Sequence, residues 1–454
     1  MTRERNKKYR LMVCPAIFVV ALVALFLTVA GAPLVADWDD TGDESWSDDD
    51  WNDDDWGSWD SDDSAFDISG YLESSGIVVL PRELGEEANV GLQTILRLRS
   101  RFEPSDGLSV VVEGEYRDRR GAANPLTRQA LIGAPGLTEA EQQQFVGTDF
   151  TREFVFDYAY GSASFGPLDL RVGRQPLAWG SAYAFNPTEV MNPSSLAELT
   201  GIEPPGITAV APSLSLGTGL GLEGYIAFED RSRQTVALSG LSRPAELPFG
   251  IRARAYVGRW DLAAGFARSV EGDQSGTLAV RDYAVSEVAG SVGPVTVYGE
   301  SAVEIAPDEE WELERSVDAA AGFQYELPFE VGLQAEYHRR GSGAGSKDDY
   351  DPTDRISGRL AARDYLVGIL DYRLLNDDLH IVFAGLSNLN DQSIALIPEA
   401  TYTVRPDFEL GLGSTLFLGP DGSEFDGRFS LGDDNGPPVD TGRPQVFLRG
   451  KWYF

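Results

Sequence analysis

The chain has 454 residues, 42% of them hydrophobic, and a formal net charge of -35. This acidic balance excludes nucleic acid as a partner, because nucleic acids are bound through basic patches that neutralise phosphates. With one cysteine, Cys14, and two histidines, His338 and His380, we expect no disulfide, no cysteine–metal cluster and no cofactor.

The first 36 residues have the layout of a secretory signal peptide. Residues 1–10 carry five basic side chains, residues 11–30 are almost wholly apolar, and small residues follow up to Ala36. We predict export with cleavage after Ala36. An uncleaved membrane anchor is the alternative, because the apolar run approaches the ~20 residues that span a bilayer. Lipoprotein attachment is disfavoured because Cys14 precedes the apolar run.

Residues 37–64 form an acidic, tryptophan-rich segment. Positions 37–63 hold 14 acidic residues and five tryptophans, with no Lys or Arg. Such a density of like charge predicts disorder, so we expect a solvated spacer. Three other roles stay open: binding of divalent cations through carboxylates, contact with a basic partner, or, if the rest of the chain encloses a lumen, insertion into it as a plug.

From residue 65 to the last residue the sequence alternates between apolar and charged side chains. In residues 90–102, Val90, Leu92, Leu96, Leu98 and Phe102 alternate with Gln93, Arg97, Arg99 and Arg101. The same pattern recurs at 108–119 and 331–340, and at 150–160, where Phe150, Phe154, Phe156, Tyr158 and Tyr160 are predicted to oppose Glu153 and Asp157. Successive side chains of a strand point to opposite faces, so each stretch predicts a strand with one apolar and one charged face.

Two all-β folds fit this alternation. A soluble sandwich would turn its apolar faces inward, whereas a transmembrane antiparallel barrel would turn them outward to lipid and keep charge inside. The cysteine-free chain without a linker after Ala65, the aromatic residues on the apolar faces, and the mixture of tight turns and long polar loops favour the barrel. We predict about 16 strands, with 14 to 18 allowed, over residues 65–454. An even number places both termini in the periplasm.

The C-terminal residues 445–454, QVFLRGKWYF, read as a final strand. Its outward face is predicted to carry Val446, Leu448, Gly450, Trp452 and the terminal Phe454. This pattern resembles the strand by which outer-membrane barrels are recognised for assembly, which implies the barrel assembly machinery as a partner.

A long loop follows the predicted strand that ends near Arg174. Residues 154–193 contain Gly173-Arg174-Gln175, then Trp179-Gly180, then Glu189-Val-Met-Asn192-Pro193. They resemble the porin-like outer-membrane proteins, a family with a Gly-Arg-Gln strand, a Trp-Gly pair and an Asn-Pro segment. The resemblance covers about 40 residues and implies fold and location more than substrate. In that setting Trp179, Asn186, Glu189 and Asn192 belong to a loop that enters and narrows the lumen, or to one packed on the barrel rim.

The alternation also predicts which charged residues face the lumen. The predicted lumen residues are Arg97, Arg99, Arg101, Glu113, Glu115, Arg117, Arg119, Asp157, Arg171, Arg252, Arg254, Glu336 and His338, with Arg449 and Lys451 on the last strand. Arginines lining a wet pore attract anions, whereas arginines matched by acids form cross-strand pairs that stiffen the wall. Both roles can coexist. Aromatic residues on the opposite face are predicted to contact lipid rather than stack on sugars.

These features predict a Gram-negative outer-membrane channel for passive diffusion of small hydrophilic, and by its arginines anionic, solutes. The alternative is a non-conducting barrel that links the envelope to a periplasmic partner through its acidic segment. An enzyme is disfavoured because the sequence has no Gly-x-Ser-x-Gly, His-Glu-x-x-His or phosphate-loop motif, and no catalytic or metal site is assigned. The expected partners are outer-membrane lipid and lipopolysaccharide, and the oligomeric state stays open.

Overall fold

The computed structural model describes residues 66–82, 88–121, 150–191, 206–229, 247–272, 278–305, 316–327, 330–351, 354, 360–430, 438–440 and 442–454. Within these ranges no helix is long and apolar enough to cross a membrane. The predicted signal peptide and the acidic segment lie outside the described residues, as does Asn192. Residues Phe66–Phe454 form one compact unit.

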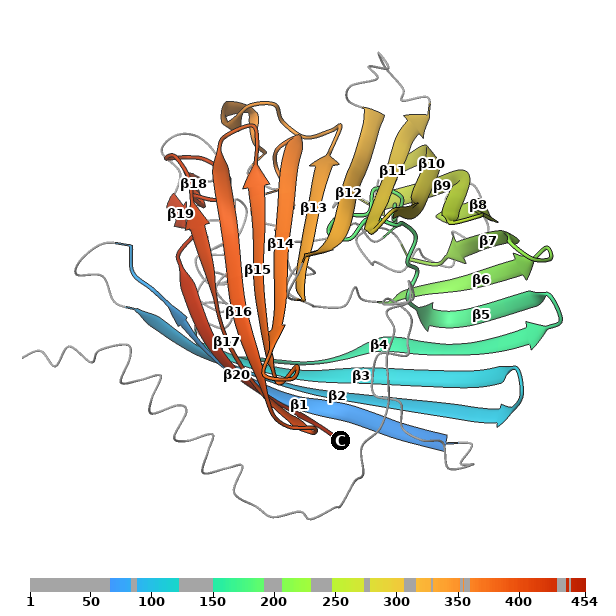
Figure 1. Ribbon diagram of the computed structural model, residues 1–454, viewed down its shortest axis with the longest axis horizontal. Coiled ribbons are helices and arrows are strands. Elements are labelled where there is room, and N and C mark those ends of the chain that lie inside the picture. Colours follow the sequence, from blue (N-terminus) through green and yellow to red (C-terminus); the bar gives the residue numbers. More distant parts are fainter. Residues whose placement is uncertain are drawn as a thin grey trace, which may run out of the picture. The chain divides into compact units, whose positions relative to one another are not determined.

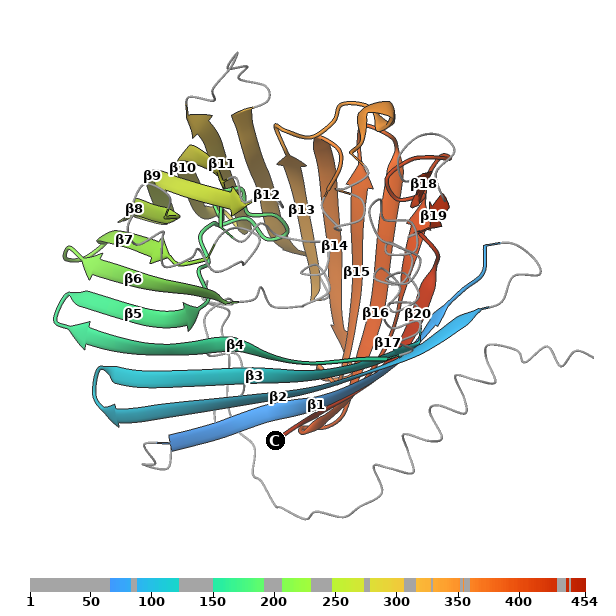
Figure 2. The same ribbon diagram turned by 180° about the vertical axis from the view of Figure 1, so that it is seen from behind.

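This unit is built from strands (Figures 1 and 2). They are β1 (Phe66–Val79), β2 (Asn89–Ser105), β3 (Leu108–Gly121), β4 (Phe150–Phe165), β5 (Leu168–Gln175), β6 (Ile207–Ser215), β7 (Leu220–Ala227), β8 (Phe249–Val257), β9 (Trp260–Gly272), β10 (Leu278–Val292), β11 (Val295–Ile305), β12 (Val317–Leu327), β13 (Val331–Arg339), β14 (Asp364–Leu374), β15 (Leu379–Asn388), β16 (Ser393–Arg405), β17 (Phe408–Leu418), β18 (Arg428–Ser430), β19 (Pro438–Asp440) and β20 (Gln445–Tyr453). One short 3-10 helix, η4, covers Lys347–Asp349.

The strands close into a ring. Each of β1 to β17 pairs antiparallel with its neighbour in the chain, β17 pairs with β20, and β20 pairs with β1. Among the described residues the ring therefore has 18 strands, while β18 and β19 form a separate pair. The prediction of an all-β antiparallel barrel is confirmed, and the strand number lies at the upper limit of the predicted range.

The two ends of the barrel differ in their connections. At one end, called here the turn end, tight turns join β2 to β3, β4 to β5, β8 to β9 and β10 to β11. Gly107 (φ 78) and Gly166 (φ 64) take the left-handed conformation that such turns require and that glycine adopts without steric cost. The start of β1 and the end of β20 also lie there. The opposite, loop end carries the longer connections, including residues 176–206 between β5 and β6.

The apolar side chains point away from the ring. Leu98, Phe102, Phe154, Phe383 and Leu412 are exposed, whereas their charged neighbours on the same strands, such as Arg97 and Asp157, are buried. A soluble sandwich would bury the apolar face, so the structure excludes that alternative. An outward apolar band is what a barrel solvated by lipid presents.

One predicted face is wrong at β4. Glu113 pairs with Tyr158 and the next residue, Gly114, pairs with Phe156, so Asp157 is the extra residue of a β-bulge. Beyond the bulge the alternation is inverted. Phe154 and Phe156 are 58% and 54% exposed on the outer face, but Tyr158 and Tyr160 are only 5% and 6% exposed. Tyr158 and Tyr160 therefore face inward rather than outward, and the period-two pattern carries no sign of the shift.

A close strand contact predicts where the ring tolerates no side chain. A Cβ added at Gly265 of β9 would lie 2.2 Å from the backbone oxygen of Ile251, whereas one added at Gly368 of β14 would meet nothing within 4 Å. We expect Gly265→Ala to destabilise the barrel by ~1–3 kcal/mol through overpacking, and Gly368→Ala to be neutral. Denaturant unfolding followed by circular dichroism checks this, and equal midpoints for the two variants would contradict it.

Candidate functional site

Charged side chains gather on the inner wall of β2, β3 and β4. Arg97 hydrogen-bonds Glu113 through Nε, and its Nη2 lies 3.4 Å from Asp157 Oδ2. Arg99 Nε lies 3.9 Å from the same Glu113 carboxylate. Asp157 keeps the inward position that follows from the outward Phe154 and Phe156, and the bulge adds Tyr158 to the same inner face. These charged residues, together with the charge pairs of Arg101, Arg117 and Arg119 on the same three strands, are called here the arginine–carboxylate network.

The network continues towards the loop end. Arg117 pairs with Glu115, and both Arg117 and Arg119 reach Glu153 Oε1, at 3.7 Å and 2.8 Å. Towards the turn end, Arg101 pairs with Glu103 at 2.7 Å and is more exposed. The predicted lumen residues of β2 to β4 are thus brought together, and each of these arginines lies beside a carboxylate.

Two further arginines lie on β8. Arg252 bridges Glu223 and Glu287, each at 2.7 Å, and Arg254 pairs with Asp261. On β5, Arg171 lies 5.9 Å from the centroid of the Tyr160 ring. Arg449 pairs with Glu399, and Lys451 Nζ lies 4.1 Å from the centroid of the Tyr71 ring. Removal of one partner from a buried pair such as Arg252–Glu287 would leave an uncompensated charge, so these pairs hold the wall in one arrangement.

The remaining predicted lumen residues, Glu336 and His338, lie on β13 outside the network. His338 packs against Phe185, with ring centroids 4.9 Å apart. The sequence placed only His338 on the lumen face, but His380 also points inward and contacts Asp371. Glu300, Glu223 and Glu287 were missed as inner-wall residues, although the same alternation runs through their strands.

The segment after β5 crosses to the far strands. Figure 1 shows it in green, running from the end of β5 toward β8 to β12. Trp179 is 8% exposed and packs edge-on against Tyr225, with centroids 5.0 Å apart. Arg252 lies over the Trp179 ring at 4.9 Å. Val190 and Met191 are buried in the same cluster. The described part of the loop, up to Met191, is therefore packed on the inner wall.

Two inward carboxylates hold this loop by its backbone. Glu300 Oε2 on β11 accepts hydrogen bonds from the amides of Ser181 (2.8 Å) and Ala182 (3.3 Å). Glu336 on β13 accepts hydrogen bonds from the next three amides, those of Tyr183, Ala184 and Phe185, at 2.9 to 3.1 Å. Hydrogen bonds to a charged acceptor are stronger than neutral ones. Five consecutive amides are thus fixed by two side chains.

The turn of the loop depends on Gly180. Its φ is 121°, and an added Cβ would lie 2.6 Å from Asn186 Oδ1 and 2.7 Å from Glu300 Oε2. Asn186 in turn closes a short bend by accepting a hydrogen bond from the Glu189 amide at 3.1 Å. The predicted loop residues Trp179, Asn186 and Glu189 therefore lie together inside the barrel, while Asn192 is outside the described residues.

A second buried polar cluster, which the sequence did not indicate, lies at the loop end of β14 to β17. Glu424 accepts hydrogen bonds from Tyr365 (2.6 Å), Asn388 (2.7 Å) and the Ala361 amide (2.7 Å). Burial raises the pKa of the Glu424 carboxyl. Burial also raises the pKa of Asp426, but hydrogen bonds from Arg428 and Arg82 outweigh it, so that pKa lies below its usual range. These contacts dock the connection after β17 onto the barrel.

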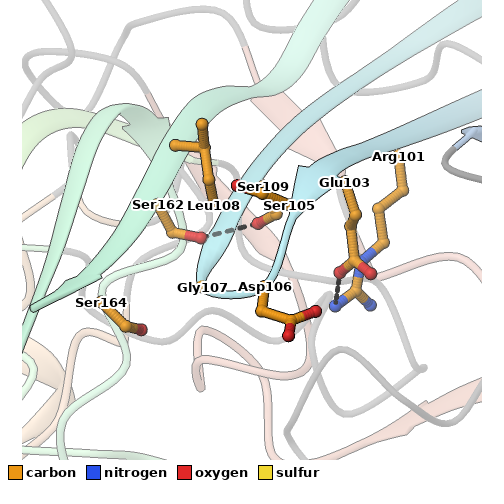
Figure 3. A pocket seen from close by; sticks show the side chains of 9 residues that line it. All are labelled: Arg101, Glu103, Ser105, Asp106, Gly107, Leu108, Ser109, Ser162 and Ser164. Carbon is orange, nitrogen blue, oxygen red and sulfur yellow. Dashed lines mark hydrogen bonds and ion pairs between the residues drawn. The ribbon is translucent and has the colours of Figure 1, made fainter. Parts of the chain in front are cut away.

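A polar hollow of about 260 Å³ lies at the turn end, beside the β2–β3 turn (Figure 3). On its lining, the hydroxyls of Ser109 and Ser162 are hydrogen-bonded at 2.6 Å, and Arg101 pairs with Glu103. It lies away from the loop after β5. No group of three metal-ligating side chains occurs in the part of the chain that the structure describes.

The hydrogen bonds between Glu336 and the loop predict how fast a protease cleaves the loop when they are weakened. Glu336→Gln removes the charge from an acceptor of three amides, and a charge-assisted hydrogen bond contributes about 1.5–3 kcal/mol. We expect cleavage by chymotrypsin after Phe185, which is 2% exposed, to accelerate on the order of tenfold. Glu153→Gln is the matched control, because Glu153 lies on the inner wall but does not touch the loop. Equal cleavage rates in the two variants would contradict the anchoring role.

Comparisons with known proteins return solved porin structures. A mutant of the Rh. blastica porin is 10% identical over 86% of this chain and 100% of its own, with a TM-score of 0.42. Salmonella typhi OmpF, in a complex with daunomycin, is 11% identical over 86% and 97%, with a TM-score of 0.38. Acinetobacter baumannii OccAB4 is 8% identical over 86% and 98%, with a TM-score of 0.49. No family model and no curated sequence matches the chain, so the resemblance of residues 154–193 stays a prediction.

Proposed function

We propose that the chain is an outer-membrane channel for passive diffusion of small hydrophilic solutes. The observation that carries this proposal is a closed ring with an apolar outer face, a charged inner wall, and a loop held inside by Glu300 and Glu336. A closed barrel leaves no strand edge unpaired and can therefore cross a membrane. The predicted signal peptide supports export to that location.

The order of strands supports a loop that lies opposite the network of β2 to β4. In a ring of 18 strands, β11 is nine places from β2, and β13 is nine places from β4. Glu300 and Glu336 therefore hold the loop on the wall that faces Arg97, Arg99 and Arg117 across the barrel. We infer that solutes pass between the loop and the network, and that this gap sets the size limit.

The pairing of the arginines bears on charge selectivity. Arg97, Arg117, Arg119, Arg252 and Arg254 each lie beside at least one carboxylate. A wall in which the charges are matched supports polar solutes in general more than a strong preference for anions. We therefore propose weak anion preference, with local dipoles of the network orienting the solute.

Single-channel recording in planar bilayers tests the channel. We expect the refolded mature protein to give discrete conductance steps, with a reversal potential that is displaced only slightly in the anion-selective direction under a salt gradient. Folded protein that never conducts would refute the proposal. Circular dichroism and a heat-dependent shift in gel mobility establish that the tested protein is folded.

A variant of the network tests its role in selectivity. Glu113→Gln removes one negative charge from beside Arg97 and Arg99. We therefore expect the reversal potential to shift in the direction of greater anion selectivity. Asp421→Asn is the matched control, because Asp421 is highly exposed in the connection after β17. A reversal potential that moves equally in both variants would show that the network does not line the conducting path.

A further inference from the structure

We propose that Arg120 and Arg152, on the outer face of β3 and β4 at the loop end, bind the phosphate groups of a phosphorylated glycolipid in the surrounding leaflet. This site faces lipid and not the lumen. The inference rests on the proposed outer-membrane location but not on conduction.

The position of the site follows from the alternation of β3. Leu108, Val110 and Val112 are exposed on the outer face, and continued alternation puts Tyr116, Asp118 and Arg120 on that face beyond them. The eight steps from Leu108 to Tyr116 span roughly 26 Å along the strand, or about 20 Å along the barrel axis at a usual tilt near 40°. The outer apolar band is ~25 Å tall in such barrels, so Arg120 lies at its loop-end boundary.

The neighbouring strand adds a second guanidinium at the same level. Arg152 of β4 lies directly beside Asp118 of β3 in the pairing, and Phe154 and Phe156 follow it on the outer face. The side chains of Arg120 and Arg152 are 55% and 54% exposed. A charge on the lipid-facing side costs about 2–4 kcal/mol at the bilayer midplane but only about 0–1 kcal/mol at the interface, so both arginines suit the boundary.

Asp118 orients the two guanidinium groups. Arg120 donates to both carboxylate oxygens, at 2.7 Å and 3.1 Å, and Arg152 Nε donates to Oδ2 at 2.8 Å. In this trio of Asp118, Arg120 and Arg152, one carboxylate faces two guanidinium groups. Guanidinium groups hold phosphate oxygens through paired hydrogen bonds, and a preoriented group loses less freedom on binding.

Three other arginines at the loop end each pair with a carboxylate on a neighbouring segment. Arg174 pairs with Glu229, Arg268 with Asp282 and Arg339 with Asp364. The turn end presents a different outer boundary, with Phe66, Phe102 and Phe165 exposed. Aromatic side chains suit a generic interface, whereas paired guanidinium groups suit a leaflet of phosphorylated lipid.

Titration of the purified, folded full chain with bisphosphorylated lipid A tests the proposal, with native mass spectrometry as the readout. We expect Arg120→Gln/Arg152→Gln to lower the affinity at least on the order of tenfold. Arg268→Gln, another arginine of the loop end, should leave it unchanged. Arg120→Lys/Arg152→Lys keeps the charge but loses the paired hydrogen bonds, so it should bind with intermediate affinity.

Three results would overturn the proposal. They are unchanged affinity of the double Gln variant, equal affinity of wild type for lipid A without phosphates, and inorganic phosphate binding at these arginines as tightly as lipid A, which would assign the site to free phosphate. If the double Gln variant fails to fold, the comparison of phosphorylated and dephosphorylated lipid on wild type still decides. Conductance measured in parallel separates this outcome from a failure of the channel.

Discussion

The pairing of β1 with β20 is the constraint on which the rest of the structure depends. In lipid, an unpaired backbone amide has no water to bind, so an open sheet edge is not tolerated. Here β1 pairs with β2 on one side and with β20 on the other. The pairing extends to the last residue, since Gly70 and Phe454 exchange both backbone hydrogen bonds, at 2.9 and 3.0 Å. Trp452 of the predicted assembly signal thus lies on the closing strand, Phe454 directly follows that strand, and both residues are exposed.

Closure of the ring creates an interior with two sides that face one another, and different kinds of contact stabilise the two sides. Arginines and carboxylates on β2 to β4 pair with each other both across strands and within β3, so that side of the wall needs no loop to cover it. On β11 and β13, Glu300 and Glu336 have no arginine beside them among the described contacts and instead accept backbone amides. The chain thus uses carboxylates in two ways inside one barrel.

Much of the fold follows from the sequence because the period-two pattern is local. It identifies strands such as those at 90–102 and 108–119, most of the outward apolar face, and inward residues such as Arg97 and Arg117, without knowledge of their partners. It does not show the bulge at Asp157, because a single extra residue leaves the composition of the strand unchanged. The role of Glu300 also escapes, since its donors lie more than a hundred residues away. Contacts of that kind depend on closure of the ring, which no local pattern encodes.

Because the loop is anchored through its main-chain amides, its path does not depend on which side chains it carries at these positions. Glu300 and Glu336 bind N–H groups that nearly every residue type supplies, whereas the Tyr183 side chain is 40% exposed. Residues at such positions can be exchanged over evolutionary time without release of the loop, while Gly180 cannot. In the channel proposed above, a few exposed loop side chains could therefore change the solute range while the scaffold stays the same.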